Sequence, residues 1–277
     1  MSRIIQDALE VYHADRDYVS STPLRAMEKS PLHFFTDWKS PEQKEPTTAM
    51  IKGQVLHSLL LEQSVDKYIA RPVKDDGSLV RSNSKEYLAF LEQNPGKIPI
   101  EPELFANLYM ALERFIENKT AMDLCKDAAI ETSIYTADQQ TRIKIKARPD
   151  IWGSDYIVDL KTTGQLDRFF ERNIFNNGFD VQLAHYAECI EAAGRPPIKN
   201  AYIIAFEQSA PYQSKVYRLG QSELKFARNT WRGYMNEISL CLKENTWPGF
   251  PSEIIDVSRP EYLNHGHGST DIFQGAV

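Results

Sequence analysis

The sequence has few cysteines, and they lie far apart. It contains three, Cys125, Cys189 and Cys241, and no two of them have the Cys-x-x-Cys spacing. Three scattered thiols cannot supply the four ligands of an iron–sulfur cluster or of a structural zinc site. They suggest no disulfide framework either, so we expect reduced thiols in a cytoplasmic protein.

Long apolar segments are also absent. No run of about 18 apolar residues occurs, so no transmembrane helix is expected. The first residues, Met-Ser-Arg-Ile-Ile-Gln-Asp, lack the apolar stretch of a signal peptide. We therefore expect no membrane partner and a location in the cytoplasm.

The third absence is a positive net charge. The 277 residues include 32 lysines and arginines and 38 aspartates and glutamates, which gives a net charge of −6. This balance argues against a large, non-specific DNA-binding surface. A local basic strip in a channel can still attract phosphates, so the net charge does not exclude a nucleic-acid substrate.

Apolar side chains, in contrast, are plentiful enough for a core. The hydrophobic share is 42%, which suits one large globular domain. We expect this domain at residues 1–250, with a helical part at about 20–126, a sheet core at about 130–220 and an irregular tail at 251–277. Helical periodicity in the first part and strand alternation in the second predict an α/β (α+β) fold, with a central mixed sheet flanked by helices.

Segments between residues 131 and 161 alternate with a period of two, as strands do. In residues 142–150 one face carries the apolar residues Ile143, Ile145 and Ala147. The other face carries the charged residues Arg142, Lys144, Lys146, Arg148 and Asp150. In residues 157–161 the two faces carry Val158 and Leu160, and Ile157, Asp159 and Lys161. If the polar faces converge, two carboxylates and an ammonium group meet at one end of a sheet among basic residues. This combination indicates a site that cuts phosphodiesters.

The residue types suit hydrolysis assisted by a hard cation. Mg²⁺ takes oxygen ligands, usually one or two carboxylates, and Asp150 and Asp159 would supply them. The bound cation lowers the pKa of its water and neutralises charge on the phosphate. Lys161 would orient the attacking water or stabilise the charged transition state. Glu131 is either a third acidic contributor or an ordinary exposed strand residue.

The same residues resemble a known superfamily. Pro149-Asp150 and Asp159-Leu160-Lys161 match the signature of the PD-(D/E)XK nucleases. Two further pairs, Gly53-x-x-x-His57 and Gln182-x-x-x-Tyr186, make the chain similar to the RecB-type branch. The opening part, from Tyr12 to Phe35, resembles the start of the C-terminal nuclease domain of RecE-type exonucleases (exodeoxyribonuclease VIII). The resemblance implies a restriction-endonuclease-like core.

The resemblance also implies roles for the residues around the two aspartates. His57 and the backbone carbonyl of Leu160 would join Asp150 and Asp159 at the metal. Gln182 and Tyr186, which share one face of a helix, would contact DNA near the scissile phosphate. We expect further DNA contacts from residues next to the motif, namely Lys146, Arg148 and Thr162. For the basic row a solvated strand face is the alternative.

The RecE-type resemblance implies a Mg²⁺-dependent exonuclease that digests linear double-stranded DNA ends 5′→3′ and leaves 3′ single strands, with Mn²⁺ able to replace Mg²⁺. Such proteins are typically ring-shaped homo-oligomers, here with a tetramer as the expected size. They act beside a single-strand annealing protein of the RecT type, in recombination and repair encoded by a phage or prophage. Two other functions stay open: an endonuclease of the restriction or repair type, and a DNA-binding module that has lost catalysis.

Overall fold

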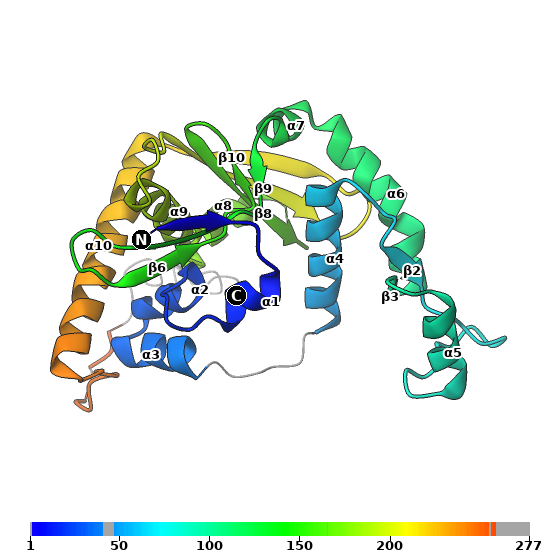
Figure 1. Ribbon diagram of the computed structural model, residues 1–277, viewed down its shortest axis with the longest axis horizontal. Helices are drawn as coiled ribbons and strands as arrows, with labels where there is room; N and C mark the ends of the chain where they lie inside the picture. Colours follow the sequence, from blue (N-terminus) through cyan, green and yellow to red (C-terminus); the bar gives the residue numbers. More distant parts are fainter. Residues whose placement is uncertain (1, 41–46, 165, 255, 259–277) are drawn as a thin grey trace, which may run out of the picture.

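The computed structural model describes residues 2–40, 47–164, 166–254 and 256–258 (Figure 1). Most of the tail predicted at 251–277 therefore lies outside the described residues. Within the described ranges, no helix is long and apolar enough to cross a membrane.

A mixed sheet of five strands forms the centre of the molecule (Figure 1). Strand β8 is parallel to β9 and antiparallel to β7, and β9 is antiparallel to β10. In sheet order the strands are β10 (Ser214–Leu219), β9 (Asn200–Glu207), β8 (Tyr156–Thr163), β7 (Ile151–Trp152) and β4 (Ala129–Ile130). Helices pack on both faces of this sheet, so the predicted α/β fold with a central mixed sheet is confirmed.

A second sheet has three strands and carries the basic segment. In order they are β1 (Arg3–Ile5), β5 (Ser133–Ala137) and β6 (Lys144–Ala147). The free edge of β6 is covered by the backbone of Val19, which donates to the Lys144 carbonyl and accepts from the Lys146 N–H. The prediction of one sheet spanning residues 131–161 is therefore wrong, because β6 and β8 belong to different sheets, and residues 148–150 lead from β6 in one sheet to β7 in the other.

Helices α3, α4, α5 and α7 begin at a side chain that accepts one of their first free N–H groups. Thr47 caps α4 by accepting the N–H of Met50. Residues 102–125 form two helices and not one, because Asn118 accepts the N–H of Ala121 and starts α7. The described helices are α1 (Leu9–Ala14), α2 (Ser21–Leu24), α3 (Pro31–Lys39), α4 (Thr48–Glu62), α5 (Lys85–Gln93), α6 (Pro102–Glu117), α7 (Lys119–Cys125), α8 (Arg168–Asn176), α9 (Phe179–Ala192) and α10 (Gln221–Glu244), with a 3-10 turn at Arg25–Glu28.

Residues 66–102 form an extension at one end of the molecule (Figure 1). The sequence predicts an irregular insertion with one short helix here, and α5 is that helix. The region also contains a parallel pair of short strands, β2 (Tyr68–Ala70) and β3 (Ile98–Ile100). Tyr68 and Ile100 are buried and attach the extension to the core beneath α4 and α6.

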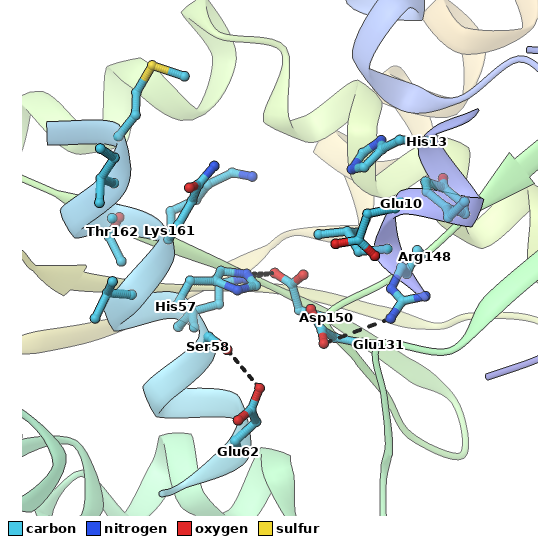
Figure 2. A pocket seen from close by; sticks show the side chains of 18 of the residues that line it. Glu10, His13, His57, Ser58, Glu62, Glu131, Arg148, Asp150, Lys161 and Thr162 are labelled. Atoms are coloured by element: carbon cyan, nitrogen blue, oxygen red, sulfur yellow. Dashed lines mark hydrogen bonds and ion pairs between the residues drawn. The ribbon is translucent and has the colours of Figure 1, made fainter. Parts of the chain in front are cut away.

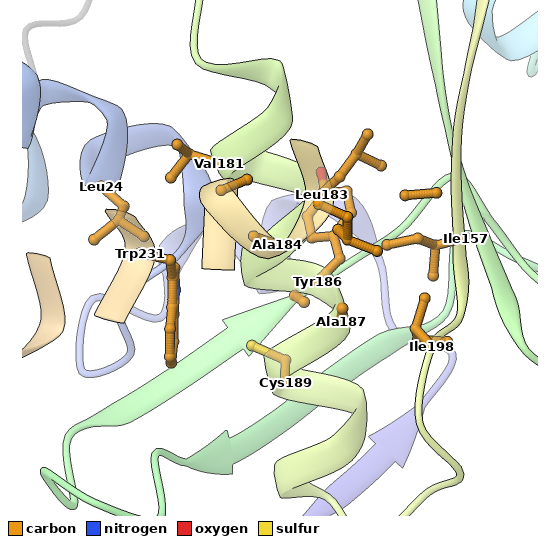
Figure 3. Packing of buried hydrophobic residues seen from close by; sticks show 14 of the residues in the cluster. Leu24, Ile157, Val181, Leu183, Ala184, Tyr186, Ala187, Cys189, Ile198 and Trp231 are labelled. Atoms are coloured by element: carbon orange, nitrogen blue, oxygen red, sulfur yellow. The ribbon is translucent and has the colours of Figure 1, made fainter. Parts of the chain in front are cut away.

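The side chains of β8 alternate as predicted, and its two faces belong to two hydrophobic cores. Val158 and Leu160 belong to the core that includes residues of α4 and α6. Ile157 lies on the opposite face, in the core formed with α9 and α10 (Figure 3). Helices α4 and α9 therefore flank the strand that carries Asp159 and Lys161, one on each side.

Candidate active site

A cavity with a volume of about 1160 Å³ lies beside α4, α1 and the end of β8 (Figure 2). Residues from distant parts of the chain meet in it. The predicted site residues that line it are His57, Glu131, Arg148, Asp150, Leu160, Lys161, Thr162, Gln182 and Tyr186.

Asp150 reaches the cavity from the junction of the two sheets. Strand β7 pairs with β8 only between Ile151–Val158 and Trp152–Ile157, so the edge of β8 beyond Val158 has no strand partner from β7. There the carboxylate Oδ2 of Asp150 accepts the backbone N–H of Leu160 at 2.6 Å. The Pro149-Asp150 and Asp159-Leu160-Lys161 segments are thus joined by a hydrogen bond that the edge of β8 donates to the Asp150 carboxylate, and not by a shared strand face.

His57 approaches Asp150 from α4. Its Nε2 lies 3.2 Å from Oδ2 of Asp150 (Figure 2). Burial opposes charge on the imidazole, but Asp150, with Asp159 and Glu131 further away, raises the pKa of His57 above its ordinary value. Burial also opposes charge on Asp150, yet His57, Lys161 and the Leu160 N–H together lower the pKa of Asp150. The pair is therefore stabilised in its charged form.

Asp159 is almost fully buried, with 2% of its surface exposed. Gln182 Nε2 donates to its Oδ1 at 2.9 Å, and Lys161 Nζ lies 2.6 Å from its Oδ2. Burial raises the pKa of Asp159 above its ordinary value, Lys161 offsets this only in part, and Asp150 adds to the rise. Among the described residues, Oδ2 has this ionic contact but no hydrogen bond of normal geometry. In the described structure this oxygen therefore faces the Lys161 ammonium.

Gln182 and Tyr186 support the site from α9. Both are buried, with 9% and 5% exposed. The Gln182 amide donates to Asp159 and to Tyr186 Oη, and its carbonyl oxygen accepts from Lys161 Nζ at 3.3 Å. Through these contacts Gln182 positions the Asp159 and Lys161 side chains, while the DNA contacts of Gln182 and Tyr186 stay a prediction.

Lys146 is the clearest correction among the predicted DNA contacts. Its side chain is buried, and the ammonium donates to the backbone carbonyls of Tyr12 and Asp15. Burial lowers the pKa of Lys146 to about 8. The alternation of β6 predicted a basic row that contacts DNA, or else faces solvent, but the N-terminal segment covers Lys146. Lys146 therefore holds this segment on the sheet and does not reach the cavity.

Arg148 and Glu131 stand together at the opposite wall of the cavity from Lys161 (Figure 2). Arg148 donates to the carbonyl and the carboxylate of Asp7 and to Ser133, and lies 3.9 Å from the Glu131 carboxylate. Glu131 is not in a strand: its φ is +44°, and its N–H donates to the Asp150 carbonyl at 3.0 Å. This backbone contact keeps Glu131 next to Asp150.

The oxygen atoms present fit a hard divalent cation. No three His, Cys, Asp or Glu side chains in the described part of the chain converge closely enough to form a metal cluster. Mg²⁺, however, needs only one or two carboxylates plus other oxygens. The Leu160 N–H points toward Asp150, and the C=O of a strand residue faces the same edge as its N–H, so this carbonyl lies on the side of Asp150. Asp150, Asp159 and that carbonyl form the donor set that fits.

Some residues at the cavity carried no signal in the sequence. Gln208 follows β9 directly and donates from Nε2 to Thr162 Oγ1 at 3.1 Å. Asp7 pairs with Arg148, and Glu10 and His13 of α1 line the cavity. Each is remote in sequence from the aspartates, so no local spacing could place it there.

Gly53 explains why α4 approaches the site so closely. A Cβ at this position would lie 2.8 Å from Thr162 Oγ1 and 3.1 Å from Gln208 Nε2. We expect Gly53→Ala to displace Thr162, next to Lys161, and to slow DNA cleavage roughly tenfold. The free energy of unfolding should change little, because the preference of alanine for a helix, about 1 kcal/mol, offsets the cost of displacing Thr162. Cleavage rates and thermal melts of purified protein measure both effects.

The matched control for this prediction is Gly233→Ala. Gly233 lies in α10, and a Cβ there meets nothing within 4 Å. This substitution should stabilise the protein without slowing cleavage. Unchanged cleavage by Gly53→Ala would contradict the close packing of α4 on Thr162.

Comparison with known proteins agrees with this fold. A candidate exonuclease from Eubacterium rectale has a similar structure, with a TM-score of 0.58 and 15% identity over 95% of this chain and 100% of that chain. An alkaline exonuclease from Laribacter hongkongensis aligns over 60% of this chain and 87% of its own at 9% identity, but its TM-score of 0.28 is too low to support an argument. No curated protein sequence matches the chain.

Residues 20–260 match the family described as "PDDEXK-like domain of unknown function (DUF3799)". The superfamily predicted from the motif, a superfamily of nucleases, is thereby confirmed. Nucleases of this superfamily generally use divalent metal ions. Because the match covers most of its length, the chain belongs to this family of PDDEXK-like domains.

Proposed function

We propose that this protein is a Mg²⁺-dependent deoxyribonuclease that digests linear double-stranded DNA from its ends. The observation that carries the proposal is the meeting of Asp150, Asp159 and Lys161 beside an open cavity. Digestion from ends is supported by the RecE-type resemblance and by the similar structure of the candidate exonuclease from Eubacterium rectale. The 5′→3′ direction is supported by the resemblance alone.

The residues divide the chemistry among them. A divalent cation bound here would lower the pKa of its water and neutralise charge on the phosphate. Asp150, Asp159 and the Leu160 carbonyl would hold it, with His57 beside Asp150. Lys161 is placed to orient the attacking water or to stabilise the charged phosphate. Gln182 forms hydrogen bonds with both Asp159 and Lys161 and so fixes the positions of their side chains.

The proposal includes two associations that rest on the same resemblance. The protein would act as a ring-shaped homo-oligomer, with a tetramer as the expected size, and would hand its 3′ single strands to an annealing protein of the RecT type. Light scattering of the purified protein tests the ring-shaped homo-oligomer. A molar mass equal to that of one subunit would remove the ring from the proposal.

One assay tests the direction and the preference for ends. Linear duplexes labelled at either the 5′ or the 3′ ends are incubated with Mg²⁺ or EDTA, beside a closed circle. Early, metal-dependent release of the 5′ label with the circle intact is expected. Early release of the 3′ label would reverse the polarity. A cut circle would identify an endonuclease, and bound but uncut DNA would identify an inactive binding module.

Exchange of the metal gives a second expected result. Mn²⁺ should replace Mg²⁺, whereas Ca²⁺ should support DNA binding with turnover slower by about 10²-fold. The reason is that the larger and looser coordination shell of Ca²⁺ places the water poorly. Binding is measured by fluorescence anisotropy of labelled duplex and turnover by release of nucleotides. Rapid turnover with Ca²⁺ would contradict the proposed metal chemistry.

A further inference from the structure

We propose that Gln208 is a positioning residue for the Thr162 hydroxyl, which donates its proton to a phosphate oxygen of bound DNA. The inference rests on the proposed function, because it takes the cavity as the place where the phosphate lies. Both side chains line this cavity, and Thr162 follows Lys161 at the end of β8 (Figure 2).

The direction of one hydrogen bond carries the argument. Gln208 Nε2 donates to Thr162 Oγ1 at 3.1 Å, so the threonine oxygen acts as an acceptor in this contact. A hydroxyl group also has one proton to donate. Among the described residues, no acceptor for this proton is found, and the side chain borders the cavity. A charged phosphate oxygen is the acceptor that such a proton suits best in a nuclease.

Strands β8 and β9 and helix α4 hold this arrangement in place. The Gln208 N–H donates to the Thr163 carbonyl at 2.9 Å and extends the β8–β9 ladder by one residue. The Gln208 side chain therefore starts from a backbone that is rigid relative to Thr162. On the other side, the backbone of α4 at Gly53 leaves no room for even a methyl group beside either polar atom. The hydroxyl oxygen is thus confined between a strand end and a helix.

Reversing the hydrogen bond separates positioning from simple packing. In Gln208→Glu the carboxylate cannot donate a hydrogen bond. It accepts one from the Thr162 hydroxyl instead, which turns the O–H away from the cavity. Thr162→Val removes the hydroxyl at nearly constant volume. We expect each variant to lower kcat/KM on linear duplex DNA roughly tenfold, the scale of one hydrogen bond to a charged group. Thr162→Ser, which keeps the hydroxyl, should restore most of the activity, and melting temperatures should stay close to that of the parent.

The double variant gives the decisive comparison. With valine at position 162 there is no proton to turn away, so Gln208→Glu should then cost only the effect of its added negative charge. Gln54→Glu measures that effect, because exposed Gln54 of α4 lines the same cavity. Losses that multiply to roughly a hundredfold in the double variant would show independent roles and overturn the inference.

The controls distinguish this inference from the proposed function. If the parent cuts DNA and Asp159→Asn does not, the nuclease proposal stands, and multiplicative losses at Thr162 and Gln208 overturn only the positioning role. If the parent does not cut DNA, both are overturned. Loss of activity in Thr162→Ser equal to that in Thr162→Val would also count against the hydroxyl as donor.

Discussion

Replacing Asp159 by asparagine is expected to lower the turnover of DNA by a factor on the order of 10³ or more. Asparagine has the shape of aspartate but lacks the charge that a hard cation requires. The loss should appear in kcat measured at saturating Mg²⁺, because the variant cannot hold the cation opposite Asp150. DNA binding in Ca²⁺ is expected to fall much less than turnover.

The fold should tolerate this change. Burial raises the pKa of Asp159, which means that the folded protein disfavours its ionised form. A neutral amide removes that cost, and it can still accept from Gln182 at the Oδ1 position. Its NH2 group would meet the Lys161 ammonium, also a donor, but Lys161 lines the cavity and can turn toward solvent. Circular dichroism and thermal melting should therefore show a folded protein with a melting temperature close to that of the parent.

A matched substitution controls for loss of charge alone. Asp155 pairs with Lys199 at the surface, outside the cavity, so Asp155→Asn should cleave DNA at the rate of the parent. Cleavage by Asp159→Asn within tenfold of the parent rate would remove Asp159 from the metal site. Unfolding of the variant would instead show that the buried charge has a structural role.

Acidification is expected to remove about 3 kcal/mol of stability through a single histidine. His185 in α9 is fully buried, accepts from Trp231 Nε1 at Nδ1 and lies 2.8 Å from the Lys146 carbonyl through Nε2. Burial lowers the pKa of His185 from 6.5 to about 4, and the hydrogen bond to the Lys146 carbonyl offsets this only in part.

The sign of the effect follows from these two pKa values. Below pH 6.5 the unfolded chain binds a proton at His185 that the folded protein binds only near pH 4. The contribution is therefore fully present above pH 6.5 and is lost progressively as the pH falls toward 4. Urea unfolding at a series of pH values measures the free energy of unfolding over this window.

His185→Gln isolates this contribution from that of the carboxylates. A glutamine can offer an oxygen to Trp231 and an N–H to the Lys146 carbonyl, but it does not take up a proton. The variant should be somewhat less stable at pH 7 and should lose less stability between pH 7 and pH 4. Parallel curves for the parent and the variant would mean that His185 does not stay neutral in the fold.

The sequence by itself determined what depends on neighbours along the chain. Alternation with a period of two placed Val158 and Leu160 on one face of β8 and Asp159 and Lys161 on the other, because side chains of a strand point to alternate faces. Residue type and order also determined the candidate ligands, since the pairing of Pro149-Asp150 with Asp159-Leu160-Lys161 needs no knowledge of packing.

Only the tertiary structure decided how the site is assembled. Lys146 shares a strand face with charged neighbours, yet the N-terminal segment folds over that face and buries it. Asp150 meets β8 because β7 stops pairing at Val158 and leaves an edge N–H for its carboxylate. Gln208 reaches Thr162 across a parallel strand pair, which joins residues 46 positions apart. Such contacts depend on which elements become neighbours in space, and no local periodicity encodes that choice.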